Sequence, residues 1–492
     1  MLPFAAGAAI FLVLATANGA GYRYGVSDQA FYIPAVARAI DPSLFPRDGP
    51  LIDAEGRLLV IDEILGGLAR GTGLSLPTLL LAGYIASVGL LWVGLWLIGT
   101  RVYRSRWAIA ALGAAFALRH RIPRTSANSF EPYFHPRMLA FGVGTLAVAA
   151  LLRRRAGLAV ALVALSALLH VTTALWFAVL IGVALAVLDA RWRRLVLPAV
   201  LAAGAVLGAA VVAGPLHGAL AIMDATWLGA VASKDSLFAT DWPLWAWAAN
   251  TGLLALLWWA QRTRERAGVA SAEDRALAWG ATALVALFLA TLPLVAAKVA
   301  LVVAFQIPRV FWLVDFVALV YVIGAVTDAG ASGVGAPSRH RAAIVAVLLL
   351  AAATARGAYI MLVERPERAL FEIGTPATPW EQAMRWIAGR PPDVHVLADP
   401  GHAWKYGTSV RVSARRDVLV EEVKDSAIAI YSREAAIRFV DRTAAIGDFS
   451  ALTADSARAL ADRYALDYLV TETDLPLPLA YRNDQFRIYS LR

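Results

Sequence analysis

Long apolar runs recur along the first three quarters of the chain, separated by short polar stretches in which arginine predominates. Runs of about 20 apolar residues are typical of membrane-spanning helices. The apolar run over 156–190 is too long for one crossing, because a single helix would span about 50 Å against a hydrocarbon core of about 30 Å. We therefore predict two helices there, meeting near His170.

Arginine clusters follow these runs at regular intervals, with room for two crossings between neighbouring clusters. Basic residues collect in cytoplasmic loops, so this spacing predicts about eleven transmembrane helices, a cytoplasmic N-terminus and an outer C-terminal domain. The third span is short, and whether it crosses fully stays open. The predicted spans are 3–20, 76–99, 106–119, 136–152, 157–171, 173–190, 195–213, 242–260, 276–296, 307–327 and 342–362.

Two segments break the apolar pattern. An outer loop over 20–75 follows the first span, and apolar residues at helical spacing in its second part predict a helix lying along the membrane interface. After 362 charges become frequent. Short buried strands at 393–399, 467–473 and 486–491, with amphipathic helices at 379–389 and 456–465, predict a small α/β domain. The predicted domains are therefore 1–362, a polytopic helical membrane domain, and 363–492, an extracytoplasmic domain.

Composition agrees with a membrane protein. Of 492 residues 59% are hydrophobic and 16% are charged, whereas soluble chains have about a quarter charged. The net charge of +9 comes mostly from arginine at membrane edges, which argues against nucleic-acid binding. No cysteine is present, which excludes a disulfide framework. Small residues at 17–20 also fit a cleavage site, but the first span lacks the basic start of a signal peptide.

The outer segment 119–137 is strongly basic, with four arginines and two histidines against one acid. Positive charge on the outer side opposes the orientation rule, so an anionic ligand would explain it, because arginine binds phosphate with two donors. Contact with lipid headgroups, or a misassigned loop, is an equal alternative. The candidate substrate- and phosphate-binding residues, including those at other outer helix ends, are Gln29, Arg124, His135, Arg137, His170, Gln306 and Arg309.

Three further charged residues attract attention. Asp28 precedes the amphipathic run 29–40, where a carboxylate is either a helix cap or a general base that reaches a substrate hydroxyl. Taken alone, the position favours the cap.

Asp315 and Arg356 lie at similar depth in neighbouring spans of opposite direction, about 8–10 Å below the outer surface. We predict that they form a buried structural ion pair rather than a proton relay.

The chain resembles the GT-C superfamily of membrane glycosyltransferases. The resemblance lies in a first helix followed by a long outer loop with "GVSDQAFYIPAVARAIDPSLFPRD", in "PYFHPRMLAFGVGTLAVAALLRRR", "ALSALLHVTTALWFAVLI" and "FQIPRVFWLVDFVAL", and in an outer tail ending "ALDYLVTETDLP". It implies a catalytic base in the first outer loop, which here is Asp28, and a polyprenyl-phosphate sugar donor. The acceptor would be a glycan, a lipid or a protein.

The resemblance is greatest to uncharacterised bacterial members, which implies a place in the bacterial cytoplasmic membrane but names no sugar. Many members carry paired acids where this chain has Asp28 and Gln29. No cofactor is therefore certain, no metal ligand is assigned, and a divalent metal is the one candidate. Two alternatives stay open: a transporter or flippase of a lipid-linked substrate, and a non-catalytic GT-C-like subunit of a membrane complex. Transporters tend to show internal repeats, and no convincing repeat is found here.

The orientation is testable with reporters. We expect alkaline phosphatase fused after Arg492 to be active and green fluorescent protein at the same site to be dark, because the spacing of the arginine clusters places this end outside. Fusions truncated within 153–155 should behave in the opposite way. A fluorescent C-terminal fusion would contradict the predicted topology.

Overall fold

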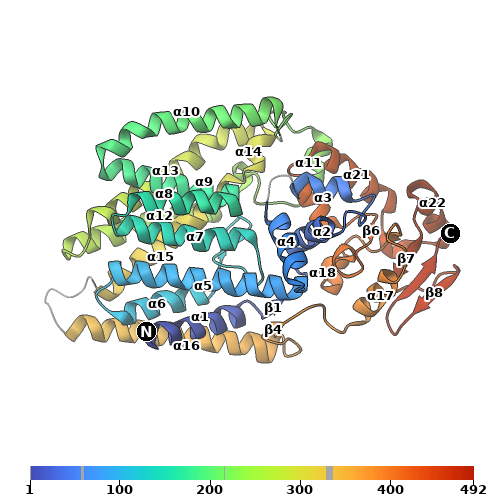
Figure 1. The fold of residues 1–492 in the computed structure, drawn as a ribbon, viewed down its shortest axis with the longest axis horizontal. Helices are drawn as coiled ribbons and strands as arrows, with labels where there is room; N and C mark the ends of the chain where they lie inside the picture. Colours follow the sequence, from blue (N-terminus) through green and yellow to red (C-terminus); the bar gives the residue numbers. More distant parts are fainter. Residues whose placement is uncertain (1, 57–59, 215, 329–335) are drawn as a thin grey trace. The chain divides into compact units, whose positions relative to one another are not determined.

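The computed structural model describes residues 2–56, 60–214, 216–328 and 336–492, and it is mostly helical (Figure 1). Contacts divide the chain into two compact units. Unit 1 comprises 1–22, 82–221 and 235–371, and unit 2 comprises 23–81, 222–234 and 372–492. The sequence had suggested a boundary near 362 with the loop 20–75 in the membrane domain. In the structure this loop groups with the C-terminal segment instead.

Unit 1 contains the long apolar helices. They are α1 (Leu2–Asn18), α5 (Leu76–Val102, which starts in unit 2), α6 (Arg106–Ala117), α7 (Pro136–Leu152), α8 (Ala156–Leu169), α9 (Val171–Leu188), α10 (Ala190–Ala213), α12 (Leu244–Arg266), α13 (Ala272–Ala296), α14 (Ala300–Ala304), α15 (Val310–Asp328) and α16 (Ala336–Tyr359). Short elements are β1 (Tyr22–Arg23), which pairs with β4 (Phe371–Glu372), the β2–β3 hairpin (Arg121–Ile122, Ala127–Asn128), the 3₁₀ turns Ala239–Asp241 and Ile307–Arg309, and the π-helical turn Ile360–Glu364.

Six segments in the described part of the chain are long and apolar enough to cross a membrane, and they differ greatly in burial. In the segment containing α14 and α15, 83% of the apolar window is buried, which makes α15 the central helix, whereas none of the window of α10 is buried. Each predicted span coincides with a helix, and α8 and α9 meet at His170 as expected. With 12 residues, α6 reaches only about 18 Å, so it is as short as the sequence indicated.

Polar contacts fix several helix ends in unit 1. Ser271 and Asp274 form a reciprocal capping box that starts α13. Asp274 also accepts a hydrogen bond from Tyr321 at 2.9 Å and lies 3.6 Å from Arg264, whose side chain is fully buried. This is a buried ion pair between the end of α12 and the start of α13, in a place where the sequence predicted none.

Unit 2 is a mixed α/β structure. Its helices are α2 (Gln29–Ile40), α3 (Gly49–Gly56), α4 (Ile61–Thr72), α11 (Ala225–Val231), α17 (Pro379–Ala388), α18 (His402–Tyr406), α19 (Val410–Ser413), α20 (Glu422–Ile428), α21 (Arg433–Ile446) and α22 (Ala454–Tyr464), with a 3₁₀ turn at Phe449–Ala451. Its strands are β5 (His395–Leu397), β6 (Asp417–Val418), β7 (Tyr468–Thr471), β8 (Leu479–Arg482) and β9 (Arg487–Ser490).

The predicted interfacial helix corresponds to α4. Ile61 and Leu65 are buried, while Ile64 and Leu68 are 44% and 45% exposed on another face. The first residues of the predicted segment, 57–59, lie outside the described residues. An apolar face left exposed directly before α5 is the pattern of a helix on a membrane surface.

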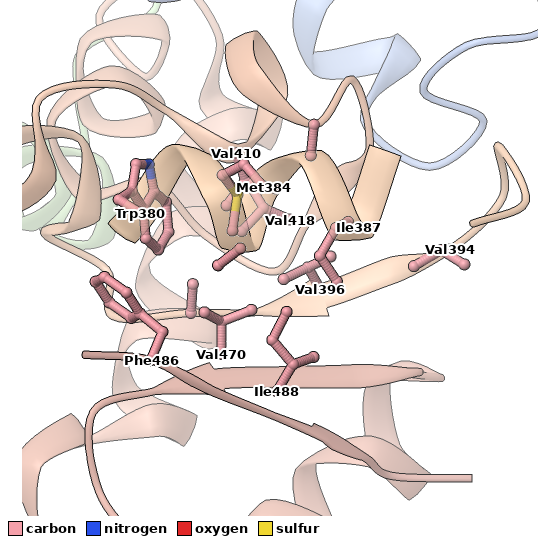
Figure 2. Packing of buried hydrophobic residues seen from close by; sticks show 13 residues of the cluster. Trp380, Met384, Ile387, Val394, Val396, Val410, Val418, Val470, Phe486 and Ile488 are labelled. Carbon is pink, nitrogen blue, oxygen red and sulfur yellow. The ribbon is translucent and has the colours of Figure 1, made fainter. Parts of the chain in front are cut away.

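The five strands form one sheet in the order β6-β5-β7-β9-β8. The first three strands run parallel, and β8 and β9 complete the sheet with antiparallel pairing. Figure 2 shows α17 lying over this sheet, with Trp380, Met384 and Ile387 packed toward Val396 and Ile488 in a common apolar core. The strands predicted at 393–399, 467–473 and 486–491 and the helices at 379–389 and 456–465 are present, whereas β6 and β8 were not predicted.

A network of buried charges connects the loop 20–75 to the sheet within unit 2. Asp48, fully buried between α2 and α3, accepts hydrogen bonds from Arg411 Nε at 2.7 Å, from the amide of Val418 at 3.1 Å, and from Arg438. Arg411 also holds Asp425 of α20 with two hydrogen bonds, the shorter at 2.6 Å. Burial opposes ionisation of Asp48, but the two guanidinium groups outweigh it and lower its pKa.

Burial raises the pKa of two other acids of the same network. Glu421, fully buried, lies 3.9 Å from Arg411, and burial raises its pKa to about 7 despite that positive charge. Asp417 accepts hydrogen bonds from the amides of Arg47 and Asp48, yet burial followed by the charge of Asp48 raises its pKa to about 6. Both carboxyls therefore oppose folding when they are ionised.

Glu421→Gln should stabilise unit 2 at alkaline pH. Because the folded-state pKa is raised above the ordinary value, the parent loses stability as pH rises from about 4.5 to about 7, and the loss persists above that pH. Glutamine does not titrate. The gain in the free energy of unfolding should therefore be of the order of 1–3 kcal/mol at pH 8 and should vanish near pH 4.5. The measurement is thermal unfolding of the purified full chain in detergent from pH 4.5 to 8.5.

Glu422→Gln, at the exposed neighbouring position, is the control and should leave the pH dependence unchanged. If Glu421→Gln and the parent lose stability in parallel between pH 5 and 8, Glu421 does not titrate in this range.

Candidate functional site

Asp28 occupies the capping position of α2, but its side chain makes no capping hydrogen bond. Its Oδ1 instead accepts a hydrogen bond from Lys424 Nζ of α20 at 2.9 Å. The Asp28 side chain is 31% exposed, whereas that of Lys424 is only 9% exposed. The capping interpretation, which the position alone favoured, is therefore wrong.

The surroundings of this ion pair are aromatic and basic. Lys424 Nζ lies 5.0 Å from the ring centroid of Phe31, one helical turn beyond Asp28. Lys234 Nζ donates to the carbonyl of Val423 at 3.0 Å, which brings a second lysine beside Lys424. Neither lysine was singled out from the sequence. We call Asp28, Lys234 and Lys424 the lysine–aspartate cluster.

Gln29 supports the backbone at this point. It is fully buried, and its Oε1 accepts a hydrogen bond from the amide of Gly25 at 2.7 Å. Gly25 has a positive φ of 80°, and a Cβ there would come within 2.9 Å of Val412, so only glycine fits the turn. Gln29 is the first residue of α2 and holds the turn that leads into this helix, while its role in substrate binding stays a prediction.

Two of the predicted histidines cap neighbouring helices of unit 1. His135 Nδ1 accepts from the amide of Arg137 at 3.0 Å and starts α7. His170 Nδ1 accepts from the amide of Thr173 at 3.3 Å and starts α9. The two rings lie 6.2 Å apart between centroids. A nitrogen that accepts carries no hydrogen, so both imidazoles are neutral and their Nε2 atoms are hydrogen-bond donors.

A third helix starts in the same neighbourhood. Arg309 directly precedes α15, and Arg137 lies with its guanidinium 5.6 Å from the ring of Trp312 in the first turn of that helix. Arg137 and Arg309 both lie close enough to His170 to act on its ring electrostatically. The starts of α7, α9 and α15 therefore converge on one electropositive place. We call His135, Arg137, His170 and Arg309 the anion cluster.

Gln306 precedes the 3₁₀ turn that contains Arg309. It is buried and adopts a left-handed backbone with φ of 49°, which costs free energy in any residue but glycine. Arg137 also donates to Glu131 at 3.1 Å, and Glu131 accepts from Arg119 at 3.4 Å. Glu131 thus pairs with both Arg119 and Arg137.

Arg124 is the predicted phosphate ligand that the structure places elsewhere. It pairs with Asp235, and both side chains are about one third to one half exposed. Arg124 lies on the same segment, 119–137, as His135, but its guanidinium is paired with a carboxylate.

The predicted ion pair of Asp315 with Arg356 is wrong. Asp315 Oδ2 lies 2.9 Å from His120 Nε2, while Arg356 donates to the side chain of Asn18 at 2.9 Å and to the carbonyl of Leu118 at 3.0 Å. Equal depth on neighbouring helices did not determine the direction of either side chain. The hydrogen bond to Asp315 raises the pKa of His120, although burial opposes this.

Within the described residues, no group of three or more His, Asp or Glu is placed to hold a metal ion. No protein-family model matches the chain, and no curated protein matches it at a significant level. The residues that the structure describes are mostly helical, with six helices long and apolar enough to cross a membrane and a small C-terminal sheet.

The His120–Asp315 contact predicts pH-dependent coupling. Because the folded-state pKa of His120 is raised, its contribution to stability is complete below about pH 6.5 and is lost as pH rises through the folded pKa. A double-mutant cycle with His120→Gln and Asp315→Asn should give a coupling free energy of about 0.5–1 kcal/mol at pH 6 and about zero at pH 9. The coupling is small because His120 is partly exposed. The coupling free energy is measured by unfolding each variant in detergent and following tryptophan fluorescence.

The matching cycle of Asp315→Asn with Arg356→Gln should be additive at both pH values. A larger coupling of Asp315 to Arg356 than to His120 would restore the pairing expected from the sequence.

Proposed function

We propose that this protein is a membrane glycosyltransferase that moves a sugar from a polyprenyl-phosphate donor to an acceptor hydroxyl on the outer face of the membrane. The observation that carries the proposal is the anion cluster, where three helix starts, two arginines and two neutral histidines meet among apolar helices. A lipid-linked phosphate has an apolar chain, which suits the apolar helices, and an anionic group, which suits the anion cluster.

The chemistry of the anion cluster supports a phosphate rather than a carboxylate ligand. Helix starts carry a partial positive charge and favour anions. His135, His170, Arg137 and Arg309 carry imidazole and guanidinium groups, which are the kinds of donor that bind the tetrahedral oxygens of phosphate. The same groups would stabilise the charge that develops on the phosphate as it leaves the sugar.

Asp28 supplies the second requirement, a base for the acceptor. Its carboxylate is partly exposed, does not cap α2, and is held by Lys424. In the proposed reaction the acceptor oxygen attacks the anomeric carbon, its proton passes to Asp28, and the bond from the sugar to the phosphate breaks with the electron pair going to the phosphate. Phe31 offers an aromatic face beside Asp28, which suits a sugar ring.

The finer topology belongs to the same proposal. About eleven crossings would place the N-terminus in the cytoplasm and the C-terminal sheet outside. The donor in the proposed step is a lipid-linked sugar and not a nucleotide sugar. Transfer on the outer side therefore requires that this donor is already in the outer leaflet. The expected setting is the cytoplasmic membrane of a bacterium, with a glycan, lipid or protein as acceptor.

Asp28→Asn should remove transfer while donor binding survives. Asparagine keeps the size of the side chain but accepts no proton, so the rate should fall about 10²–10⁴-fold, the usual contribution of a general base. Arg309→Gln should instead weaken donor binding, because a charge-assisted contact to the phosphate is lost. The assay uses the purified full chain with radiolabelled polyprenyl-phosphate hexoses and pentoses, separating transfer from donor retention in detergent.

Asp455→Asn, an exposed acid on α22, is the control for Asp28, and Arg356→Gln is the control for Arg309. Full transfer by Asp28→Asn would reject Asp28 as the base. Donor binding by the parent without transfer to any acceptor would favour the flippase or scaffold alternatives.

A further inference from the structure

Lysine is rare in this chain and is concentrated at Asp28. The sequence has 41 arginines and four lysines, and two of those lysines, Lys234 and Lys424, belong to the lysine–aspartate cluster. The two residue types differ in one chemical respect that matters here. An arginine stays protonated in proteins, whereas a lysine that is partly buried beside another cation can lose its proton and act as a base.

The geometry brings both amines to one short stretch of α20. Lys424 Nζ bonds Asp28 Oδ1 at 2.9 Å, and Lys234 Nζ bonds the carbonyl of Val423, the residue before Lys424, at 3.0 Å. Lys234 follows α11 and Asp28 precedes α2, so three separate segments of unit 2 contribute to the cluster. The contact of Lys234 with a carbonyl leaves its charge without a carboxylate partner at hydrogen-bond distance.

The charges that face Lys234 come from the other two segments of the cluster. Burial comes first and the ammonium of Lys424 second in lowering the pKa of Lys234 to about 8, while Asp28 and Glu422 act in the opposite direction. Near pH 7.5 a substantial fraction of Lys234 is therefore a neutral amine. An ordinary lysine, which titrates near 10.4, would be almost wholly charged.

We propose that Lys234 is the terminal proton acceptor of the lysine–aspartate cluster and that Lys424 is the positioning residue that holds the carboxylate of Asp28. The proposal rests on the proposed function. Asp28 takes the proton of the acceptor hydroxyl as the new glycosidic bond forms and the phosphate leaves. The proton then passes to the neutral amine of Lys234, which becomes an ammonium and returns Asp28 to the carboxylate form. Release of the proton to water restores Lys234.

The first test needs no activity. Reductive methylation with ¹³C-formaldehyde labels the lysines of the purified full chain, and four lysines give few enough signals to follow by NMR in detergent. Loss of one signal in Lys234→Arg assigns Lys234. We expect this signal to titrate near pH 8 in the parent, to move toward 10 in Lys424→Met, and to move below 8 in Asp28→Asn.

The opposite directions of these two shifts separate electrostatic coupling from general disruption of the fold. Titration of Lys234 near 10.4 in the parent, or the same shift in both variants, would overturn the proposal. If Lys424→Met does not fold, the shift in Asp28→Asn decides the point alone.

The second test compares pH profiles of transfer. The parent should gain activity as pH rises toward 8, because Lys234 must be neutral to accept a proton. Lys234→Met and Lys234→Arg should both lose this rise and fall roughly tenfold at pH 8, since arginine keeps the charge but accepts no proton. Lys405→Met, on the surface and paired with Asp399, is the control and should keep the parent profile.

The outcomes separate the two proposals. Full transfer by Asp28→Asn would reject the base assigned in the proposed function, whatever Lys234 does. Loss of transfer in Asp28→Asn together with an unchanged profile in Lys234→Arg would reject only the role of Lys234. If the parent transfers none of the sugars tested, the titration of the labelled lysines still decides whether Lys234 is the low-pKa amine inferred here.

Discussion

The buried contact of Asp48 with Arg411 determines the arrangement of unit 2. Arg411 holds Asp425 on its other side, so one guanidinium joins the loop after α2 to the start of α20. Lys424 precedes Asp425, and Asp28 precedes α2, so the Asp28–Lys424 pair depends on this link. Buried charges add little net stability, but a wrong partner leaves an unpaired charge at a cost of several kcal/mol. The network thereby specifies which segments meet.

In unit 1 the corresponding constraint is the satisfaction of polar groups among apolar helices. Helix starts expose amide groups, and in apolar surroundings each needs an acceptor. His135 and His170 meet this need with Nδ1, and the same hydrogen bonds fix the tautomer that makes Nε2 a donor. A structural role and a binding role are thus compatible in one ring, because each uses a different nitrogen.

These contacts explain what the sequence could and could not predict. Helix positions followed from hydropathy, because burial in lipid needs long apolar runs, and the break at His170 followed from length alone. Partners did not follow. Asp315 was assigned to Arg356 by depth, yet it bonds His120 on a loop whose path no periodicity encodes. The approach of His135, His170 and Arg309 was predicted only as a common face, and Lys424 was missed because its neighbour Asp28 is about 400 positions away.

The two clusters differ in chemistry in a way that composition alone did not reveal. The anion cluster uses arginines, whose charge does not change with pH, and histidines held neutral by their capping bonds, so its affinity for an anion should be steady. The lysine–aspartate cluster contains Lys234, whose pKa burial lowers to about 8. Fixed donors suit the holding of a phosphate, and titratable amines suit the movement of a proton. A chain with ten arginines for each lysine, which nonetheless places two lysines at one carboxylate, therefore favours proton transfer over simple charge pairing at Asp28.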